Sequence, residues 1–245
     1  MSSGLRILFL THSFNSLAQR LHVELTERGH EVSIEFDIND AVAMEAVALC
    51  EPDLIIAPYL RRRIPDVIWQ NHVCLVVHPG IKGDRGPSAL DWAIQNRETE
   101  WGVTVLQANG VMDGGDIWAA RTFSLGGAAK SSVYRNAVTE AAVDAVLEAL
   151  EKFRHGGFKP EPLDYTKPDV RGRPHRFMNQ HDRRIDWQRD NTATVLAKMR
   201  AADAYPGVLD DIAGTQVYLF HGVEEKRLRA DTPGEIIQNG NLRFC

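Results

Sequence analysis

Short apolar runs alternate with amphipathic segments along the first half of the chain. The run from Leu5 to Leu10 is almost unbroken, which is typical of a strand buried on both faces of a parallel sheet. Similar runs predict three further strands, over residues 31–36, 54–57 and 73–77. The spacing of apolar residues between them predicts helices over residues 17–28, 39–50 and 66–70. This alternation predicts an α/β fold, Rossmann-like and doubly wound, with a mostly parallel sheet.

The pattern continues into the second half of the chain and then changes. Its last regular elements are a helix over 89–96, strands over 102–106 and 116–123, and a helix from 131 or 132 to about 153. Four prolines and three glycines between residues 156 and 174 then predict a linker. A helix over 191–201 and strands over 217–223 and 235–245 follow it. We therefore expect a domain over 1–170, and over 171–245 a small OB-like β domain that is incomplete.

Charge and hydropathy narrow the class of protein. The formal net charge of −5 argues against a general nucleic-acid binder, because phosphate binding normally requires a basic surplus. The three arginines at 61–63 are a local exception, for which a solvated loop is the alternative. No apolar run approaches the roughly 18 residues that cross a bilayer, and no signal-peptide pattern opens the chain. We expect a cytoplasmic protein that binds neither nucleic acid nor a membrane.

The cysteines and most of the histidines give little sign of a metal or a disulfide. Cys50, Cys74 and Cys245 lie far apart and form no Cys-x-x-Cys pair. A disulfide framework and a cysteine zinc site are therefore not expected, and a reducing compartment fits best. His22 and His30 lie on or just after the first predicted helix, and His155, His175 and His181 lack the spacing with acids that a metal site requires. The sequence predicts no metal site.

His78 ends a predicted strand and opens a loop rich in glycine and proline, residues 78–87. Ligands of such sheets bind at the carboxyl ends of the strands. A histidine there can shuttle a proton beside closely approaching backbone. A buried structural histidine is the alternative interpretation.

A second polar stretch, residues 110–116, places Asp113 and Asp116 among three glycines. It predicts a turn between two strands, and a plain hairpin turn is the simpler interpretation. The acids can also hold a histidine in one tautomer, or keep a water ordered for proton relay. The stretch is therefore a second candidate for site chemistry.

A third polar stretch follows the first predicted strand and opens a helix. Its polar side chains are Ser13, Asn15, Ser16, Gln19 and Arg20. A helix N-terminus offers free N–H groups and a positive dipole end to a phosphate. Ordinary capping, with the arginine on a solvated face, is the alternative. No Gly-x-Gly-x-x-Gly or Walker pattern is present, so a nicotinamide or nucleoside triphosphate site has little support.

The histidine and aspartate stretches together resemble the folate-dependent formyltransferases, which act on methionyl-tRNA, glycinamide ribonucleotide or sugar nucleotides. That family carries an Asn-x-His-Pro-Ser strand end, a loop ending in Arg-Gly, a Gly-x-Thr strand and an Asp-x-Gly turn. The similar segments here are residues 76–79, 84–86, 102–105 and 113–116. Residues 53–65 resemble the segment that lines the folate pocket, and residues 184–201 resemble the start of the small C-terminal domain. The resemblance spans nearly the whole chain in the right order.

Two positions depart from the family pattern. The catalytic asparagine of the family falls on Val76, and the second histidine of some members falls on Leu106. The asparagine is thought to polarise the formyl carbonyl, and losing such a donor costs on the order of 10²–10³ in rate. Either another donor replaces it, or the acceptor is easier to acylate than an amine, or the fold binds folate without reaction.

Residues 78–88, His-Pro-Gly-x-x-Gly-Asp-Arg-Gly-Pro-Ser, and residues 11–20 resemble a more specific family, the hydrogenase maturation factors HypX or HoxX. In that family a formyltransferase-like half passes the formyl group to coenzyme A. A second half, similar to enoyl-CoA hydratase, then releases CO for the nickel–iron site. The resemblance implies that this chain is part of a longer protein and that it works with a hydrogenase maturation complex.

The resemblance also implies roles for individual residues, with 10-formyl-tetrahydrofolate as donor and coenzyme A as acceptor. It makes His78 and Asp113 the catalytic pair. The folate-binding residues it implies are Pro58, Tyr59, Leu60, Arg61, Ile64, Pro65, Gly110 and Asp113. The third polar stretch, Ser13 to Arg20, would hold a phosphate of coenzyme A. Two alternatives stay open: a formyltransferase acting on an amine of a tRNA, sugar or nucleotide, and a catalytically silent folate-binding or scaffold module.

Overall fold

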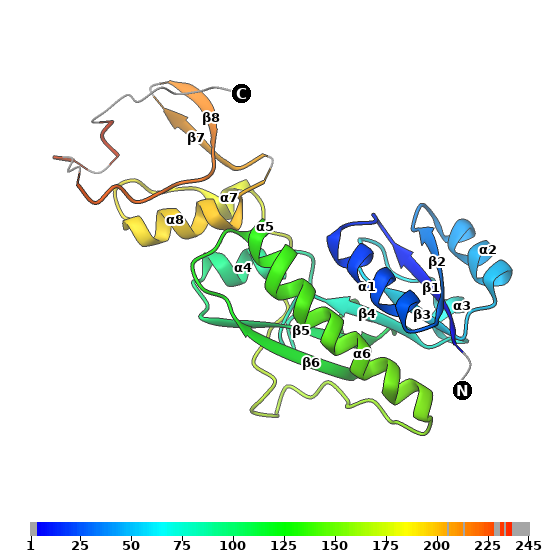
Figure 1. Ribbon diagram of the computed structural model, residues 1–245. Coiled ribbons are helices and arrows are strands. Elements are labelled where there is room, and N and C mark those ends of the chain that lie inside the picture. The colour runs from blue at the N-terminus through cyan, green and yellow to red at the C-terminus, as the bar shows by residue number, and fades with distance from the viewer. Residues whose placement is uncertain (1–3, 205, 213, 228–230, 233, 237–245) are drawn as a thin grey trace.

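A six-stranded sheet forms the centre of the protein in the computed structural model, which describes residues 4–204, 206–212, 214–227, 231–232 and 234–236 (Figure 1). The strands are β1 (Arg6–Thr11), β2 (Glu31–Phe36), β3 (Leu54–Ala57), β4 (Cys74–His78), β5 (Glu100–Gln107) and β6 (Ile117–Ser124). Their order across the sheet is β2-β1-β3-β4-β5-β6. Strands β1 to β4 are parallel, and β5 runs antiparallel to both of its neighbours. The predicted mostly parallel α/β fold is confirmed.

The strand order places a topological switch point between β1 and β3. From β1 the chain moves to one side to form β2, and it then crosses to the other side to form β3. Neighbouring loops leave the sheet in opposite directions at such a point, which opens a crevice at the carboxyl ends of the strands. The loops that follow β1 and β3 therefore border the region where a ligand of this fold binds.

Helices cover both faces of the sheet, and each face has its own apolar core (Figure 1). Helix α1 (Ser16–Glu27) and helix α6 (Thr139–His155) pack on one face. Helix α2 (Asp40–Cys50) and the short α3 (Asp66–Trp69) cover the other. The predicted stripe of Leu17, Leu21 and Leu25 is fully buried, as the helical spacing required.

The long helix predicted from residue 131 or 132 forms as three joined pieces. It begins with α5 (Lys130–Val133), continues through a π-helical turn, η1 (Tyr134–Val138), and ends with α6. A π turn inserts an extra residue into the helix, and such turns are frequent at functional sites. The side chain of Thr139 donates a hydrogen bond to the carbonyl oxygen of Tyr134 at 2.9 Å, beside this turn.

The proline- and glycine-rich segment 156–177, predicted in part as a linker, lies along the sheet. Glu161 and Ile117 exchange two backbone hydrogen bonds, of 2.7 and 2.9 Å, at the edge strand β6. Further along, the amide of Gly172 donates to the carbonyl of Lys82 at 2.9 Å, and the amide of His175 to that of Arg85 at 2.8 Å. The segment therefore connects β6 with the loop after β4, and the domain boundary near residue 170 stays a prediction.

The C-terminal part contains α7 (Gln180–Arg183), α8 (Thr192–Ala201), and a two-stranded antiparallel sheet of β7 (Val208–Ile212) and β8 (Thr215–Leu219). Helix α8 packs against α4 (Ala89–Gln95), which follows the loop after β4. The strand predicted over 217–223 is present as β8, shifted toward the N-terminus, whereas β7 was not predicted. Most of the strand predicted over 235–245 lies outside the described residues. In the described part of the chain, no helix combines the length and apolarity that crossing a membrane requires.

Candidate functional site

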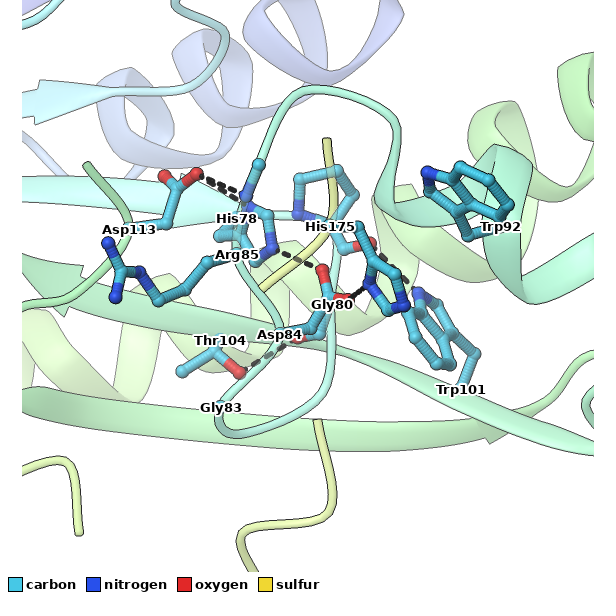
Figure 2. A network of polar contacts seen from close by, with 12 residues as sticks. His78, Gly80, Gly83, Asp84, Arg85, Trp92, Trp101, Thr104, Asp113 and His175 are labelled. Atoms are coloured by element: carbon cyan, nitrogen blue, oxygen red, sulfur yellow. Dashed lines mark hydrogen bonds and ion pairs between the residues drawn. The ribbon is translucent and has the colours of Figure 1, made fainter. Parts of the chain in front are cut away.

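His78 is the last residue of β4 and is held between two carboxylates (Figure 2). Its side chain is only 4% exposed. The imidazole Nε2 lies 2.8 Å from Oδ2 of Asp84, and Nδ1 lies 3.6 Å from Oδ2 of Asp113. The first distance is a short hydrogen bond, whereas the second is an ion-pair separation that is too long for a direct hydrogen bond. The two stretches predicted separately from the sequence thus meet at one histidine.

The loop after β4 is fixed by hydrogen bonds from β5 to its backbone. The Thr104 hydroxyl donates to the carbonyl of Gly80 at 2.8 Å, and the indole N–H of Trp101 donates to the carbonyl of Pro79 at 3.0 Å. Gly80 lies directly against the imidazole, because a Cβ at this position would lie 2.5 Å from Nε2 of His78. A glycine is therefore required for the loop to approach the histidine this closely.

Asp113 is held in the turn between β5 and β6 with left-handed backbone, at a φ of 49°. Its Oδ2 accepts a hydrogen bond from the amide of Gly86 at 3.0 Å, so the turn is bound to the loop that follows β4. The Arg85 Nε donates to the carbonyl of Met112 at 2.9 Å and adds a second link. These contacts fix the carboxylate of Asp113 beside His78.

Opposing influences act on the protonation of His78. Burial, the largest of them, lowers the pKa of the imidazole. The hydrogen bond to Asp84 and the negative charges of Asp113 and Asp84 raise it and together outweigh burial, so the net shift of the pKa is upward. The imidazolium form is thus favoured to a higher pH than for a free histidine, and His78 is suited to donate a proton.

This shift predicts a pH-dependent contribution to stability. A histidine whose pKa is raised by folding stabilises the fold fully below its unfolded value of about 6.5, and the contribution is lost as pH rises through the folded value. We expect the free energy of unfolding of the chain to exceed that of a His78→Gln variant most at about pH 6, and the difference to shrink toward alkaline pH. Urea unfolding of both proteins at a series of pH values, from about pH 6 upward, measures this difference in free energy. A difference that grows with pH would contradict the assigned charge state.

A cavity of about 970 Å³ opens beside His78 and Asp113. Of the predicted folate-binding residues, its lining includes Pro58, Tyr59, Leu60, Arg61, Ile64 and Asp113. Pro65 and Gly110 are outside the lining: Pro65 precedes α3, and Gly110 lies in the turn that leads to Asp113. The lining is therefore built mainly from the loops after β3 and β4 and from the turn between β5 and β6.

The two positions that depart from the formyltransferase pattern face each other. Val76 on β4 pairs in register with Leu106 on β5, and both side chains line the cavity. Because neither side chain has a hydrogen-bonding group, this part of the wall next to His78 is apolar. Any side-chain donor to a bound carbonyl must come from elsewhere in the cavity.

The residues predicted to hold a phosphate are only partly directed at the cavity. Asn15 and Ser16 line it, whereas Ser13, Gln19 and Arg20 do not. The Asn15 Oδ1 caps α1 by accepting from the amide of Ala18 at 3.0 Å. Arg20 forms an ion pair with Glu24 at 2.6 Å on the outer surface of the helix. Asn15 therefore caps the helix, as the alternative interpretation of this stretch predicted, and it also lines the cavity.

Three residues near the cavity were not predicted from the sequence. Tyr134, at the start of the π turn, lines the cavity and accepts a hydrogen bond from Nδ2 of Asn15 at 3.0 Å. Burial raises its pKa to about 12, so the phenol stays protonated. Asp84 and His175 lie behind His78 and contact each other at 2.9 Å. Within the described residues, no group of three or more His, Cys, Asp or Glu side chains is arranged to hold a metal ion.

One family model and two related proteins are similar to this chain. Residues 178–245 match the family model described as the formyl transferase C-terminal domain. The hydrogenase maturation factor HoxX of Bradyrhizobium diazoefficiens is 54% identical over 233 residues, which are 95% of this chain and 41% of that protein. A methionyl-tRNA formyltransferase of Chloroflexus aurantiacus is 25% identical over 206 residues, 82% of this chain and 64% of that protein.

Solved structures give a matching result. The crystal structure of HypX from Aquifex aeolicus in complex with tetrahydrofolic acid superimposes with a TM-score of 0.88 at 50% sequence identity. The match covers 96% of this chain and 40% of that one. The chain therefore spans about two fifths of the length of HoxX and HypX, and it matches them over nearly its whole extent.

Proposed function

Since the chain belongs to the folate-dependent formyltransferases, in the HypX and HoxX branch, we propose that it transfers the formyl group of 10-formyl-tetrahydrofolate to coenzyme A. The observation that carries the proposal is the position of His78. A buried imidazole, paired with two carboxylates, borders a cavity that is lined by six of the eight residues expected to bind folate. A pocket of this size can bind a folate, and a proton donor beside it can protonate the folate nitrogen that leaves during acyl transfer.

The chemistry follows from the charge state of the site. The thiol of the acceptor loses its proton to the carboxylate of Asp113, and the sulfur attacks the formyl carbon to form a tetrahedral oxyanion. As this intermediate collapses, the bond between the formyl carbon and N10 breaks, and N10 takes the proton of His78. The proton held by Asp113 then returns to His78. The products are the formyl thioester and tetrahydrofolate, with no net change in protons.

The apolar wall at Val76 and Leu106 supports a thiol rather than an amine as acceptor. An amine formyltransferase of this family uses an asparagine at the first position to polarise the carbonyl, and valine cannot do this. A thiolate is intrinsically a strong nucleophile and depends less on such activation. The protonated imidazole of His78 can in addition stabilise the developing oxyanion.

The rim of the cavity supports an acceptor with phosphate groups. Five basic side chains belong to the lining: Arg61, Arg62, Arg63, Lys130 and Arg135. Asn15 and Ser16, at the N-terminus of α1, lie in the same lining. Lysine and arginine side chains favour the phosphates of a molecule such as coenzyme A, and so does a helix N-terminus.

The similarity to HoxX and HypX supports a role in hydrogenase maturation. We propose that this formyl transfer is the first step in making the CO ligand during [NiFe]-hydrogenase maturation, in the cytoplasm. A second, enoyl-CoA-hydratase-like domain of the longer protein would release CO from the formyl thioester. A hydrogenase maturation complex is then the expected partner.

The test is to incubate the chain with 10-formyl-tetrahydrofolate, with and without coenzyme A, and to follow the release of tetrahydrofolate. We expect release that depends on coenzyme A, together with a formyl thioester detected by mass spectrometry. Release that requires an amine acceptor, offered in parallel as a sugar nucleotide or a charged tRNA, would favour the ordinary formyltransferase. Tight folate binding without turnover on any acceptor, for this chain and the full-length protein, would favour a binding module.

A further inference from the structure

Asp84, which is not part of the cavity lining, joins His78 to a second histidine (Figure 2). The Asp84 side chain is fully buried, at 0% exposure. Its Oδ2 contacts Nε2 of His78 at 2.8 Å, and its Oδ1 contacts Nδ1 of His175 at 2.9 Å. Each carboxylate oxygen therefore has its own imidazole partner, and the buried charge is matched by two donors.

The second histidine is itself fixed. His175 belongs to the segment 156–177, and its amide donates to the carbonyl of Arg85 at 2.8 Å. Its ring stacks on Trp92, with 5.7 Å between centroids and 21° between planes. The indole N–H of Trp92 donates to the carbonyl of Arg176 at 2.9 Å. The imidazole of His175 is thus locked against α4, with its side chain 28% exposed at the surface.

The backbone around Asp84 is shaped for this contact. A Cβ on Gly80 would lie 2.6 Å from Oδ2 of Asp84, and a Cβ on Gly172 would collide with the amide of Asp84. The amide of Asp84 also donates to the carbonyl of Ile81 at 2.9 Å, which closes the turn. Gly80 therefore makes room for the carboxylate of Asp84, and Gly172, from a distant part of the chain, makes room for its backbone.

This arrangement decides which nitrogen of His78 can react. An ionised carboxylate only accepts hydrogen bonds, so Nε2 of His78 carries a proton in the neutral imidazole as well as in the imidazolium. The nitrogen that gains and loses the exchangeable proton is then Nδ1. Nδ1 faces Asp113, which lines the cavity, whereas Nε2 faces the buried Asp84.

We propose that Asp84 and His175 are positioning residues for formyl transfer: Asp84, anchored by His175, holds His78 as the Nε2–H tautomer, so that Nδ1 is the nitrogen that exchanges protons with the reacting groups. The role in transfer rests on the proposed function, whereas the tautomer does not. The charged groups that face His78 are Asp84, from the loop after β4, and Asp113, from the turn between β5 and β6. His175 acts on His78 only through Asp84.

The test compares the chain with an Asp84→Asn variant by ¹⁵N NMR of the histidine rings, across a pH titration. In the unaltered chain we expect the neutral form of His78 to carry its proton on Nε2. The two histidines contact different oxygens of Asp84, so an uncharged amide, with an oxygen on one side and an NH₂ donor on the other, can accept from only one of them. In the variant we expect a lower pKa for His78 and a larger fraction of the Nδ1–H tautomer. We expect kcat for formyl transfer to fall by about 10²- to 10⁴-fold, the usual contribution of a general acid or base, because the imidazole is no longer held in the reactive tautomer.

Two further variants separate positioning from stability. His175→Asn keeps a donor near the place of Nδ1, and His175→Phe keeps the ring on Trp92 but loses the donor. We expect His175→Phe to lose about tenfold in activity, and His175→Asn to retain most of it, because a hydrogen bond to a charged group is lost only in the first. Asp190→Asn removes a carboxylate that pairs with Lys198 at 2.5 Å outside the site, and it should leave the His78 titration unchanged.

The outcomes distinguish this inference from the proposed function. If His78 titrates through Nε2, or if Asp84→Asn leaves its tautomer and pKa unchanged in a folded protein, the positioning role is wrong even where formyl transfer is observed. If the NMR result is as expected but no acceptor is formylated by the chain or by the longer protein, the proposed reaction fails and the tautomer assignment stands.

Discussion

Replacing His78 by alanine is expected to slow formyl transfer by about 10²- to 10⁴-fold, which is the usual contribution of a general acid or base. The variant loses the imidazole that borders the cavity and leaves the carboxylates of Asp84 and Asp113 without their shared partner. Folate binding should change much less, because most of the cavity lining comes from other residues. The expected signature is therefore a large loss in kcat with a nearly unchanged affinity for tetrahydrofolate.

The measurement needs a control for the loss of a buried group. His30→Ala removes a histidine that is also buried but lies outside the site, where its Nδ1 accepts a hydrogen bond from the amide of Leu5 at 3.0 Å. It should leave transfer unchanged. Thermal unfolding of both variants shows whether the His78 variant is folded at the assay temperature. Full activity in a folded His78→Ala variant would remove His78 from the mechanism, and the role of Asp113 beside it would then have no support.

Most of the sheet could be predicted because its strands are short apolar runs between clear helix and turn signals. The sequence also located His78 at a strand end and Asp113 in a turn. It could not show that these two side chains flank one another, since the register of β4 on β5 brings together residues that are far apart in the chain. The resemblance to a family, rather than the pattern, linked them in advance.

Asp84 and His175 could not be assigned to the site from the sequence pattern. Asp84 stood in the glycine-rich loop already singled out, and a carboxylate six residues after His78 was the available signal. His175 gave no such signal, because it contacts Asp84 across 91 positions of sequence. Its segment is rich in proline and glycine and therefore predicted a linker. The extended backbone of that segment instead forms hydrogen bonds with residues of β6 and of the loop after β4.

Gly80→Ala is expected to reduce formyl transfer at least as much as the loss of Asp84, although it adds only one methyl group. The added Cβ would lie 2.5 Å from Nε2 of His78 and 2.6 Å from Oδ2 of Asp84, the two atoms whose hydrogen bond orients the imidazole. The loop cannot move aside freely, because Thr104 and Trp101 hold its backbone on β5. The histidine and the carboxylate must therefore separate, and overpacking of this kind costs about 1–3 kcal/mol of stability.

The effect of this substitution is purely steric, because Gly80 does not have the positive φ that only glycine adopts easily. Gly127→Ala is the matched control: the nearest atom to its added Cβ is a guanidinium nitrogen of Arg200 at 3.4 Å, an ordinary contact. We expect Gly127→Ala to retain activity and stability, and Gly80→Ala to lower the pKa of His78 together with kcat. If Gly80→Ala loses activity while the titration of His78 is unchanged, the contact between His78 and Asp84 is not what orients the catalytic group. The glycine would then be needed for the path of the loop along the cavity.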